Sequence, residues 1–251
     1  MGKFQKIAAL VALGVYFSAP VTMAAGGSTK MAKADIDPGN IPSLQRGARN
    51  FMNYCSGCHS AQYVRYKTIG KYLELSEEQL IDNLMFNADK TFETIQASMS
   101  SVDAARWYGV APPDMSLMVR AKGADHVYNF LKGFYVSKDS PIGVNNVVLA
   151  GTSMPHVLWE LQGFQVANFS AHNNDDGSVT TTFEDFEALT AGSMDAEDYD
   201  EFVRDTVNFL AYISEPIRSD RRKLGVWVLM FLIFFYILAS MLKKQIWKDV
   251  K

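Results

Sequence analysis

The sequence predicts a mainly α-helical domain with long irregular loops, followed by one C-terminal transmembrane helix. Capped segments with apolar residues at helical spacing recur along the chain, whereas strand patterns are few. An uncharged apolar segment of nineteen residues, Leu224 to Leu242, lies near the C-terminus. The 251 residues carry 24 basic and 27 acidic side chains, a formal net charge of −3 that gives no indication of nucleic-acid binding.

Residues 1–25 have the composition of a secretory signal peptide. Lys3 and Lys6 precede an almost wholly apolar run from Ile7 to Phe17, and small residues then allow cleavage after Ala24 or Ala25. The run is too short to span a bilayer, although an uncleaved N-terminal anchor is the alternative. We therefore expect the body of the chain, residues 26–220, to be exported as one domain with a sizeable core.

The first helix of this body is predicted to begin after Pro42 with Ser43 as its cap. Its apolar face contains Leu44, Ala48, Phe51 and Met52 and leads directly into Cys55. Gly47 lies four residues before Phe51, so a second helix could cross closely there; ordinary amphipathic packing is the alternative. Ser76 to Gln79 form a capping-box pattern ahead of another helix.

Caps and apolar spacing also predict the elements further along the chain. Asp114 is expected to cap a short helix that ends near Gly123, and Val127 to Phe134 suggest the next. Val144 to Ala150 is β-branched and apolar, as in a short strand or an extended stretch. Asp195 is expected to cap a last helix with acids in its first turn, ended by Pro216.

Cys55-Ser56-Gly57-Cys58-His59 decides most of the chemistry, and these are the only two cysteines. In a CxxCH motif the two thiols form thioethers to a haem, and the histidine becomes an iron ligand. A disulfide would not use His59, and a zinc site would need two more ligands. A thioredoxin-like redox pair would favour a βαβ context, which is not evident here. We therefore predict a cytochrome c-type haem domain with one covalently bound haem c.

The residues alone leave two candidates for the second iron ligand, Met154 and His156. Met154 lies in a Gly-Thr-Ser-Met-Pro loop with no helical face, and Pro155 favours extended backbone before it. A thioether ligand favours reduced iron, which suits electron transfer. His156 is the rival ligand, and the other methionines have the spacing of core side chains.

The C-terminal apolar segment reaches roughly 28 Å as a helix, close to the hydrocarbon thickness of a bilayer. Basic residues flank both ends, so their distribution leaves the orientation undecided. With an exported body, residues 221–243 would be the anchor helix and residues 244–251 a cytoplasmic tail.

The chain resembles the cytochrome c1 family, the haem c subunits of ubiquinol–cytochrome c reductase. The resemblance rests on CSGCHSAQYVRY at 55–66, APPDMSLMVRAK at 111–122, GTSMPHVLWELQG at 151–163, and RDTVNFLAYISEPIRSDRRKLG at 204–225. These segments cover most of the mature chain in the order that the family has them. The single C-terminal anchor adds to the resemblance.

The resemblance implies roles for individual residues. Cys55 and Cys58 would carry the haem, with His59 and Met154 as axial ligands of its iron. Pro112 and Pro113 would line the haem pocket. Arg120 or Lys122 would meet a haem propionate, since a charge-assisted bond suits either, and Tyr128 or His126 would be a further partner. A solvated helix end is the alternative for Arg120.

Acidic side chains are concentrated between residues 172 and 205, where eleven acids face a single arginine, Arg204. Such a run usually forms a solvated surface. The functional alternative is docking of a basic soluble cytochrome, because complementary charge speeds encounter.

The expected function is electron transfer and not bond chemistry by this chain alone. By analogy with the family, it would take single electrons from the Rieske iron–sulfur protein and pass them to a periplasmic cytochrome c, soluble or membrane-attached. Its other partners would be cytochrome b and the lipid bilayer of the bacterial inner membrane, with the haem domain in the periplasm. The alternatives are an independent anchored cytochrome that serves a terminal oxidase, and a periplasmic thiol-disulfide protein.

Overall fold

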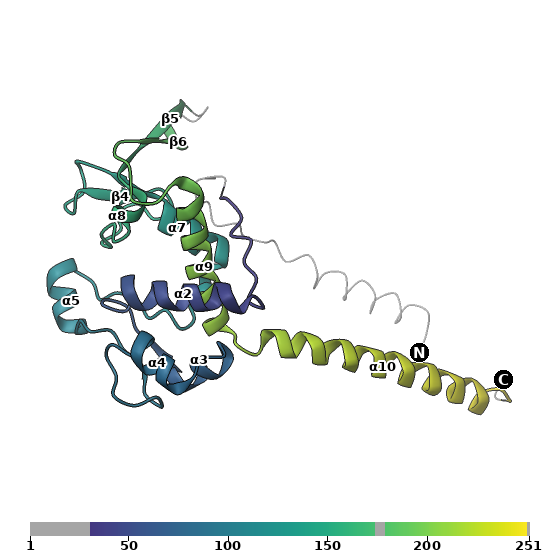
Figure 1. Cartoon of the computed structure of the whole chain (residues 1–251). Helices are drawn as coiled ribbons and strands as arrows, with labels where there is room; N and C mark the ends of the chain where they lie inside the picture. Colours follow the sequence, from purple (N-terminus) through teal and green to yellow (C-terminus); the bar gives the residue numbers. More distant parts are fainter. Residues whose placement is uncertain (1–30, 174–178, 250–251) are drawn as a thin grey trace.

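The structure is a computed structural model that describes residues 31–173 and 179–249 (Figure 1). The expected signal peptide lies outside the described residues. The elements in chain order are α2 (Ile41–Tyr54), β1 (Ala61–Arg65), α3 (Tyr66–Tyr72), α4 (Glu77–Leu84), β2 (Thr94–Ile95), α5 (Ser101–Tyr108), α6 (Met118–Lys122), α7 (Ala124–Lys132), β3 (Phe134–Val136), β4 (Val144–Asn146), α8 (Trp159–Gln162), β5 (Gln165–Asn173), β6 (Val179–Ala188), α9 (Ala196–Ser214) and α10 (Arg218–Ile246). The predicted mainly helical fold with long loops is confirmed.

The centre of the domain is the crossing of α2 and α9, which packs the first helix of the body against the last (Figure 1). A Cβ atom on Gly47 would lie 2.0 Å from the carbonyl oxygen of Asp205 and 2.8 Å from the Cβ of Phe209. The ring centroids of Phe51, on α2, and Phe209, on α9, lie 5.9 Å apart. The close approach expected at Gly47 is therefore confirmed, and only glycine permits it.

A buried polar group ties the two helices together beside Gly47. Ser43 Oγ donates to the carboxylate of Asp205 at 2.6 Å, and Arg46 Nε donates to the same carboxylate at 2.5 Å. Asn208 donates in turn to Ser43 Oγ at 2.8 Å. Because the Asp205 side chain is only 6% exposed, these bonds satisfy a charge that burial would otherwise penalise.

Two predicted caps are confirmed and two are wrong. Ser76 and Gln79 form both bonds of the capping box of α4, and Asp195 accepts from the backbone at the start of α9. Helix α2 begins at Ile41 with Asn40 as its cap, because the Ser43 hydroxyl donates its hydrogen bond to Asp205. Asp114 does not cap α6, since its carboxylate accepts from the backbone of Ser116 and Gln62.

The hairpin of β5 and β6 has no counterpart in the sequence prediction. Its strands pair antiparallel from Gln165 with Ala188 to Asn173 with Val179, and a bulge lies at Asn168/Phe169. Figure 1 shows the hairpin as an arm that projects from the domain. Tyr135, Phe169, Phe183 and Phe186 form a chain of ring contacts along its base. The short strand expected within Val144–Ala150 is confirmed as β4, paired with β3.

Helix α10 leaves the domain at Arg218 and extends away from it (Figure 1). The segment Asp220–Ile246 has a mean hydropathy of 2.4 in its most apolar window, none of which is buried in the chain. A helix of this length and composition needs a bilayer or partner helices around it. The predicted single C-terminal transmembrane helix is thus supported by length, composition and exposure.

Candidate haem-attachment site

The CxxCH motif forms one tight turn at the C-terminal end of α2. Cys55 caps the helix, and its amide donates to the carbonyl of Phe51 at 2.9 Å. The amides of Cys58 and His59 both donate to the carbonyl of Cys55, at 3.1 and 2.8 Å. This turn gathers two free thiols and one imidazole on a single loop of backbone. It is the geometry that attachment of one cofactor at two thiols requires.

Two later segments hold the turn from outside. On one side, Met99 donates its amide to the carbonyl of Gly57 at 3.0 Å, and Ala97 donates to Ser60 Oγ at 2.8 Å. On the other side, Met115 donates its amide to the carbonyl of Ser60 at 2.7 Å. These hydrogen bonds fix the turn independently of any contact with a cofactor.

The Pro-Pro segment orients His59. The Nδ1 of His59 lies 2.8 Å from the carbonyl oxygen of Pro113, and Pro112 is half-buried beside it. A carbonyl can only accept, so Nδ1 carries the proton and the lone pair of Nε2 is left for a metal. Burial lowers the pKa of His59, against the opposing effects of the Pro113 carbonyl and of Asp114. The imidazole is therefore neutral, the form that binds iron.

The Cys55 thiol has the opposite character to a reactive redox thiol. Cys55 as a whole residue is half-buried, but desolvation of its thiol, with a further contribution from Cys58, raises its pKa to about 12. The motif also follows the C-terminal end of a helix, where the dipole disfavours a thiolate. Redox CxxC thiols instead have lowered pKa values.

Among residues 31–173 and 179–249, no group of three or more His, Cys, Asp and Glu side chains is placed to hold a metal ion. Two thiols at one turn and a neutral imidazole with a fixed tautomer do fit a covalent haem. We therefore take Cys55, Cys58 and His59 as the residues that would hold it.

Met154 lies in a loop shaped by hydrogen bonds from backbone amides to side-chain oxygens. Asn145 Oδ1 accepts from the amide of Gly151 at 2.9 Å, and Gly151 has a φ of +74°, which favours glycine. The amide of Met154 then donates to Thr152 Oγ1 at 3.3 Å. The partly buried thioether side chain packs against the main apolar core, which also contains Met52 of α2.

His156, the rival ligand, lies in a separate aromatic cluster. Its ring stacks on Phe134 with centroids 5.1 Å apart and planes at 6°, and Phe164 meets it edge-on at 6.4 Å. The residue is only 6% exposed, and burial lowers its pKa to about 4, against a smaller opposing effect of the Gly163 backbone. These contacts hold the imidazole between rings, and neither of its nitrogens has a hydrogen-bond partner among the described residues, so the ring contacts do not decide between Met154 and His156.

The predicted propionate partners separate into two groups. Arg120 and Lys122 are exposed on α6, and neither forms an ion pair with any residue that the structure describes. Lys122 lies close to His126, whose pKa is lowered by burial and then by the lysine charge. Tyr128 is different, because its buried hydroxyl donates to Asp200 and accepts from Lys132 at 3.2 Å. Lys122 and His126 are therefore better placed than Tyr128 to meet an anionic group.

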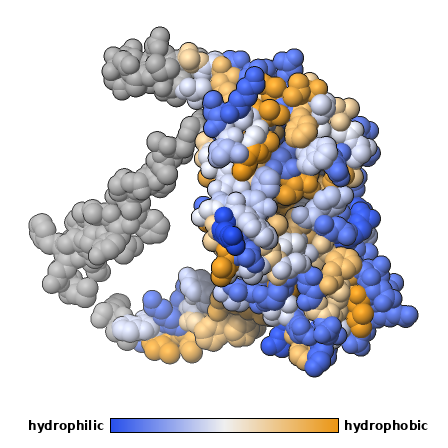
Figure 2. Space-filling view, turned by 90° about the vertical axis from the view of Figure 1, so that its left-hand side faces the viewer, coloured by the Kyte–Doolittle hydropathy of each residue, from blue (hydrophilic) through white to orange (hydrophobic). Residues whose placement is uncertain are grey.

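The acidic run does not form one surface. Glu184, Asp185 and Glu187 lie on β6, whereas Asp200 and Asp205 of α9 form ion pairs with Lys132 and with Arg46 within the domain. Asp175 and Asp176 lie outside the described residues. Only part of the run is thus free for a docking partner. Figure 2, which views the domain from the side opposite α10, shows apolar areas interspersed with polar ones.

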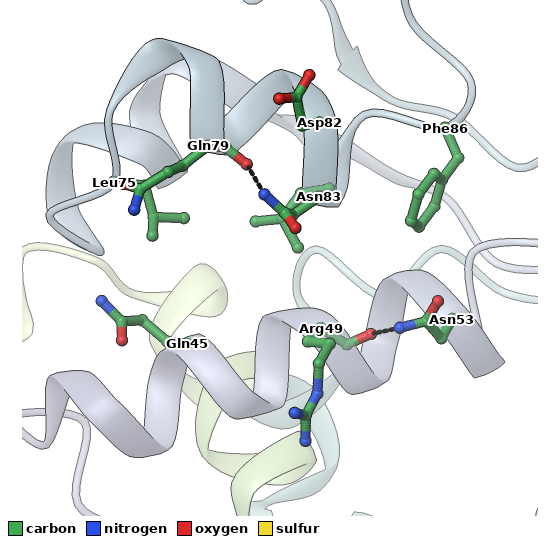
Figure 3. Close-up of a pocket in the computed structure, with 9 residues that line it drawn as sticks. Gln45, Arg49, Asn53, Leu75, Gln79, Asp82, Asn83 and Phe86 are labelled. Carbon is green, nitrogen blue, oxygen red and sulfur yellow. Dashed lines mark hydrogen bonds between the residues drawn. The ribbon is translucent and has the colours of Figure 1, made fainter.

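A separate hollow of about 410 Å³ lies between α2 and α4 (Figure 3). Gln45 and Asn53 of α2 line it from one side, and Gln79 and Asn83 of α4 from the other, while the guanidinium of Arg49 points away from α4. None of the predicted haem ligands lines this hollow. It is therefore distinct from the attachment turn.

Comparison with known proteins gives consistent relatives. The model of the Cytochrome C1 family matches residues 36–250. A cytochrome c1 of Allochromatium vinosum is 43% identical over 228 residues, which cover 91% of this chain and 93% of that protein. A protein of Nitrosomonas europaea named ammonia monooxygenase gamma subunit is 37% identical over 95% of this chain and 96% of its own length. A cytochrome c1 of Rhodospirillum rubrum is 28% identical over 84% of the chain and 82% of that protein.

Proposed function

Because this chain belongs to the cytochrome c1 family, we propose that it passes single electrons from a Rieske iron–sulfur protein to a periplasmic cytochrome c within ubiquinol–cytochrome c reductase. The family makes it a haem c electron-transfer subunit. The observation that carries the proposal is the attachment turn, in which Pro113 holds His59 with its Nε2 available to iron. The chain is a subunit of the enzyme and does not catalyse the overall reaction alone.

One haem, attached through Cys55 and Cys58, would supply reversible one-electron oxidation and reduction of its iron. The chain would bind that iron through His59 and Met154. The thioether of Met154 favours the reduced state, and the apolar core against which it packs excludes water from that side. Arg120 or Lys122 would balance a propionate charge, and His126, neutral because its pKa is lowered, would donate a hydrogen bond.

The proposed placement follows from the two ends of the chain. Residues 1–25 would direct export and be removed, and residues 26–220 would form the haem domain in the bacterial periplasm. Residues 221–243 would cross the inner membrane once, and residues 244–251 would remain in the cytoplasm. Cytochrome b, the Rieske subunit and the bilayer would then be its neighbours.

The Nitrosomonas relative suggests a different assembly, because its name places it with an ammonia monooxygenase. No described residue of this chain favours that partner, and the haem-attachment turn has the same use in either assembly. An independent anchored cytochrome remains the other alternative. The bound partners, more than the site itself, distinguish these possibilities.

The test is a reduced-minus-oxidised absorption spectrum of the tagged chain purified gently from its native membranes. A c-type band together with b-type bands supports assembly with cytochrome b. A c-type band alone, with a monooxygenase or no partner in the preparation, contradicts the proposed complex. Absence of any haem band contradicts the assignment of Cys55, Cys58 and His59.

A further inference from the structure

The membrane-proximal end of the haem domain carries cations that the proposed function does not use. Arg218, Arg221, Arg222 and Lys223 all precede Leu224, where the apolar part of α10 begins. Arg221 forms an ion pair with Glu215. The other three cations are exposed, and none of them forms an ion pair with a residue in the described part of the chain.

Helix α3, far away in sequence, brings two more cations to the same place. Lys67 and Lys71 are exposed and four residues apart, so they lie on one face of α3. The ring of Tyr72 meets that of Tyr212, at the end of α9, with centroids 5.8 Å apart. Lys71 Nζ lies 5.8 Å from the centroid of the Tyr72 ring. Figure 1 likewise shows α3 close to the start of α10.

The start of α10 reaches the same junction. Burial raises the pKa of the Tyr212 hydroxyl, and the charges of Tyr72 and Asp220 add to that effect, which places Asp220 near the two rings. Two exposed acids lie among these cations in the sequence: Glu74 follows Lys71, and Asp220 lies between Arg218 and Arg222. Glu93 also lies beside Tyr66, the residue before Lys67. These three acids do not balance five cations. We call Lys67, Lys71, Arg218, Arg222 and Lys223 the basal surface.

We propose that the basal surface binds the phosphate headgroups of anionic phospholipids in the leaflet next to the haem domain. Because the side chains from Leu224 onward are apolar and exposed, that part of α10 lies in hydrocarbon, which puts Arg222 and Lys223 at headgroup depth. Lysine and arginine bind phosphate oxygens through charge-assisted hydrogen bonds. Cations within a Debye length of an anionic leaflet are attracted to it.

The contribution of α3 makes this surface more than a flank of basic residues at the end of a transmembrane helix. Headgroups bound to Lys67 and Lys71 would attach the domain to the leaflet at a second place, beside the covalent link through α10. Two attachments restrict the tilt of the domain, whereas a single helix permits rotation about its end. The proposal depends on the membrane position of α10 and not on the electron donor or acceptor.

The test uses the full-length, haem-loaded protein in phosphatidylcholine bilayers that contain a trace of spin-labelled phosphatidylglycerol or spin-labelled phosphatidylcholine. The measured quantity is the ratio of the two lipids immobilised by the protein. The unaltered protein should prefer phosphatidylglycerol, and high salt should weaken that preference. The double variant K67Q/K71Q should lose much of it, at most about fivefold for each lysine removed.

Two matched variants complete the test. K67R/K71R keeps both charges and should keep the lipid preference. R106Q/K138Q removes two exposed cations on α5 and the β3–β4 loop and should behave like the unaltered protein. Equal lipid preference for K67Q/K71Q and R106Q/K138Q would overturn the proposal. Loss of co-purifying partner proteins with unchanged lipid preference would also overturn it, because the basal surface would then be a protein interface.

Discussion

Replacing Gly47 with alanine tests the helix crossing on which the haem-attachment turn depends. The added Cβ would lie 2.0 Å from the carbonyl oxygen of Asp205, whereas ordinary contact begins near 3.4 Å. The atoms that it meets are backbone and Cβ atoms of α9, which cannot rotate away. Helices α2 and α9 must therefore separate by roughly 1 Å or more, a displacement that protein interiors resist.

The cost can be worked from the contacts at the crossing. Overpacking of a core costs about 1–3 kcal/mol. Separation also weakens the buried 2.6 Å bond from Ser43 Oγ to Asp205, and a bond to a charged group is worth about 1.5–3 kcal/mol. The better helix propensity of alanine returns about 1 kcal/mol. A net loss of about 3 kcal/mol corresponds to a fall in melting temperature of about 6–12 °C.

The assay is thermal unfolding of the haem-loaded, full-length protein, followed by circular dichroism, together with the yield of haem per chain. Gly57→Ala is the control, because a Cβ on Gly57 meets no atom within 4 Å although it lies inside the CxxCH motif. The Gly57 variant should melt like the parent. The reasoning is refuted if Gly47→Ala also melts within about 2 °C of the parent, since that equals less than about 1 kcal/mol.

Three further substitutions have expected outcomes. Met154→Leu should lower the haem reduction potential in a redox titration, because the thioether favours reduced iron; an unchanged potential would assign the sixth position to another side chain. Tyr212→Phe should leave the melting temperature unchanged or raise it by a few degrees, because the buried hydroxyl has no hydrogen-bond partner among the described residues, and a clear fall would reveal one. Asp200→Asn should cost about 1–3 kcal/mol at neutral pH. Burial raises the pKa of Asp200, but hydrogen bonds from Lys132 and Tyr128 outweigh it and the net pKa is lowered. The contribution of Asp200 is therefore complete above its ordinary value of 3.8 and lost as the pH falls below it, so the two proteins should converge in acid.

Short-range signals predicted the helices whose ends are determined locally. The capping box at Ser76 and the cap at Asp195 involve residues two or three positions apart, so the sequence contains the whole interaction. Ser43 and Asp114 have equally good capping side chains, yet both are used elsewhere. Ser43 bonds to Asp205, 162 residues away, and Asp114 to the backbone of Gln62. Long-range partners of this kind leave no local pattern.

The hairpin was missed for a different reason. The bulge between Asn168 and Phe169 interrupts the alternation of apolar and polar side chains by which a strand is predicted. The β-branched and aromatic run from Thr180 to Phe183 is the signal that could have indicated β6, but the acids around it favoured a solvated segment.

The sequence predicted the residue types of the attachment site but not the segments that hold the site in place. CxxCH contains Cys55, Cys58 and His59 within five residues, and each has a defined role in haem chemistry. That the Pro113 carbonyl holds His59 follows only from the folded chain, because 54 residues separate the two. The residues after the motif gave no sign that Ser60 would bond to both of the segments that hold the turn.

The crossing of α2 and α9 also determines when the domain can be completed during synthesis. The apolar face of α2 packs mainly against α9, and α9 ends only four residues before the anchor helix begins. Nearly the whole domain must therefore be made before α2 can pack against α9. Contacts between segments so far apart in the sequence slow folding. The turn that follows α2 does not share this delay, because the segments that hold it, around Met99 and Met115, are made well before α9.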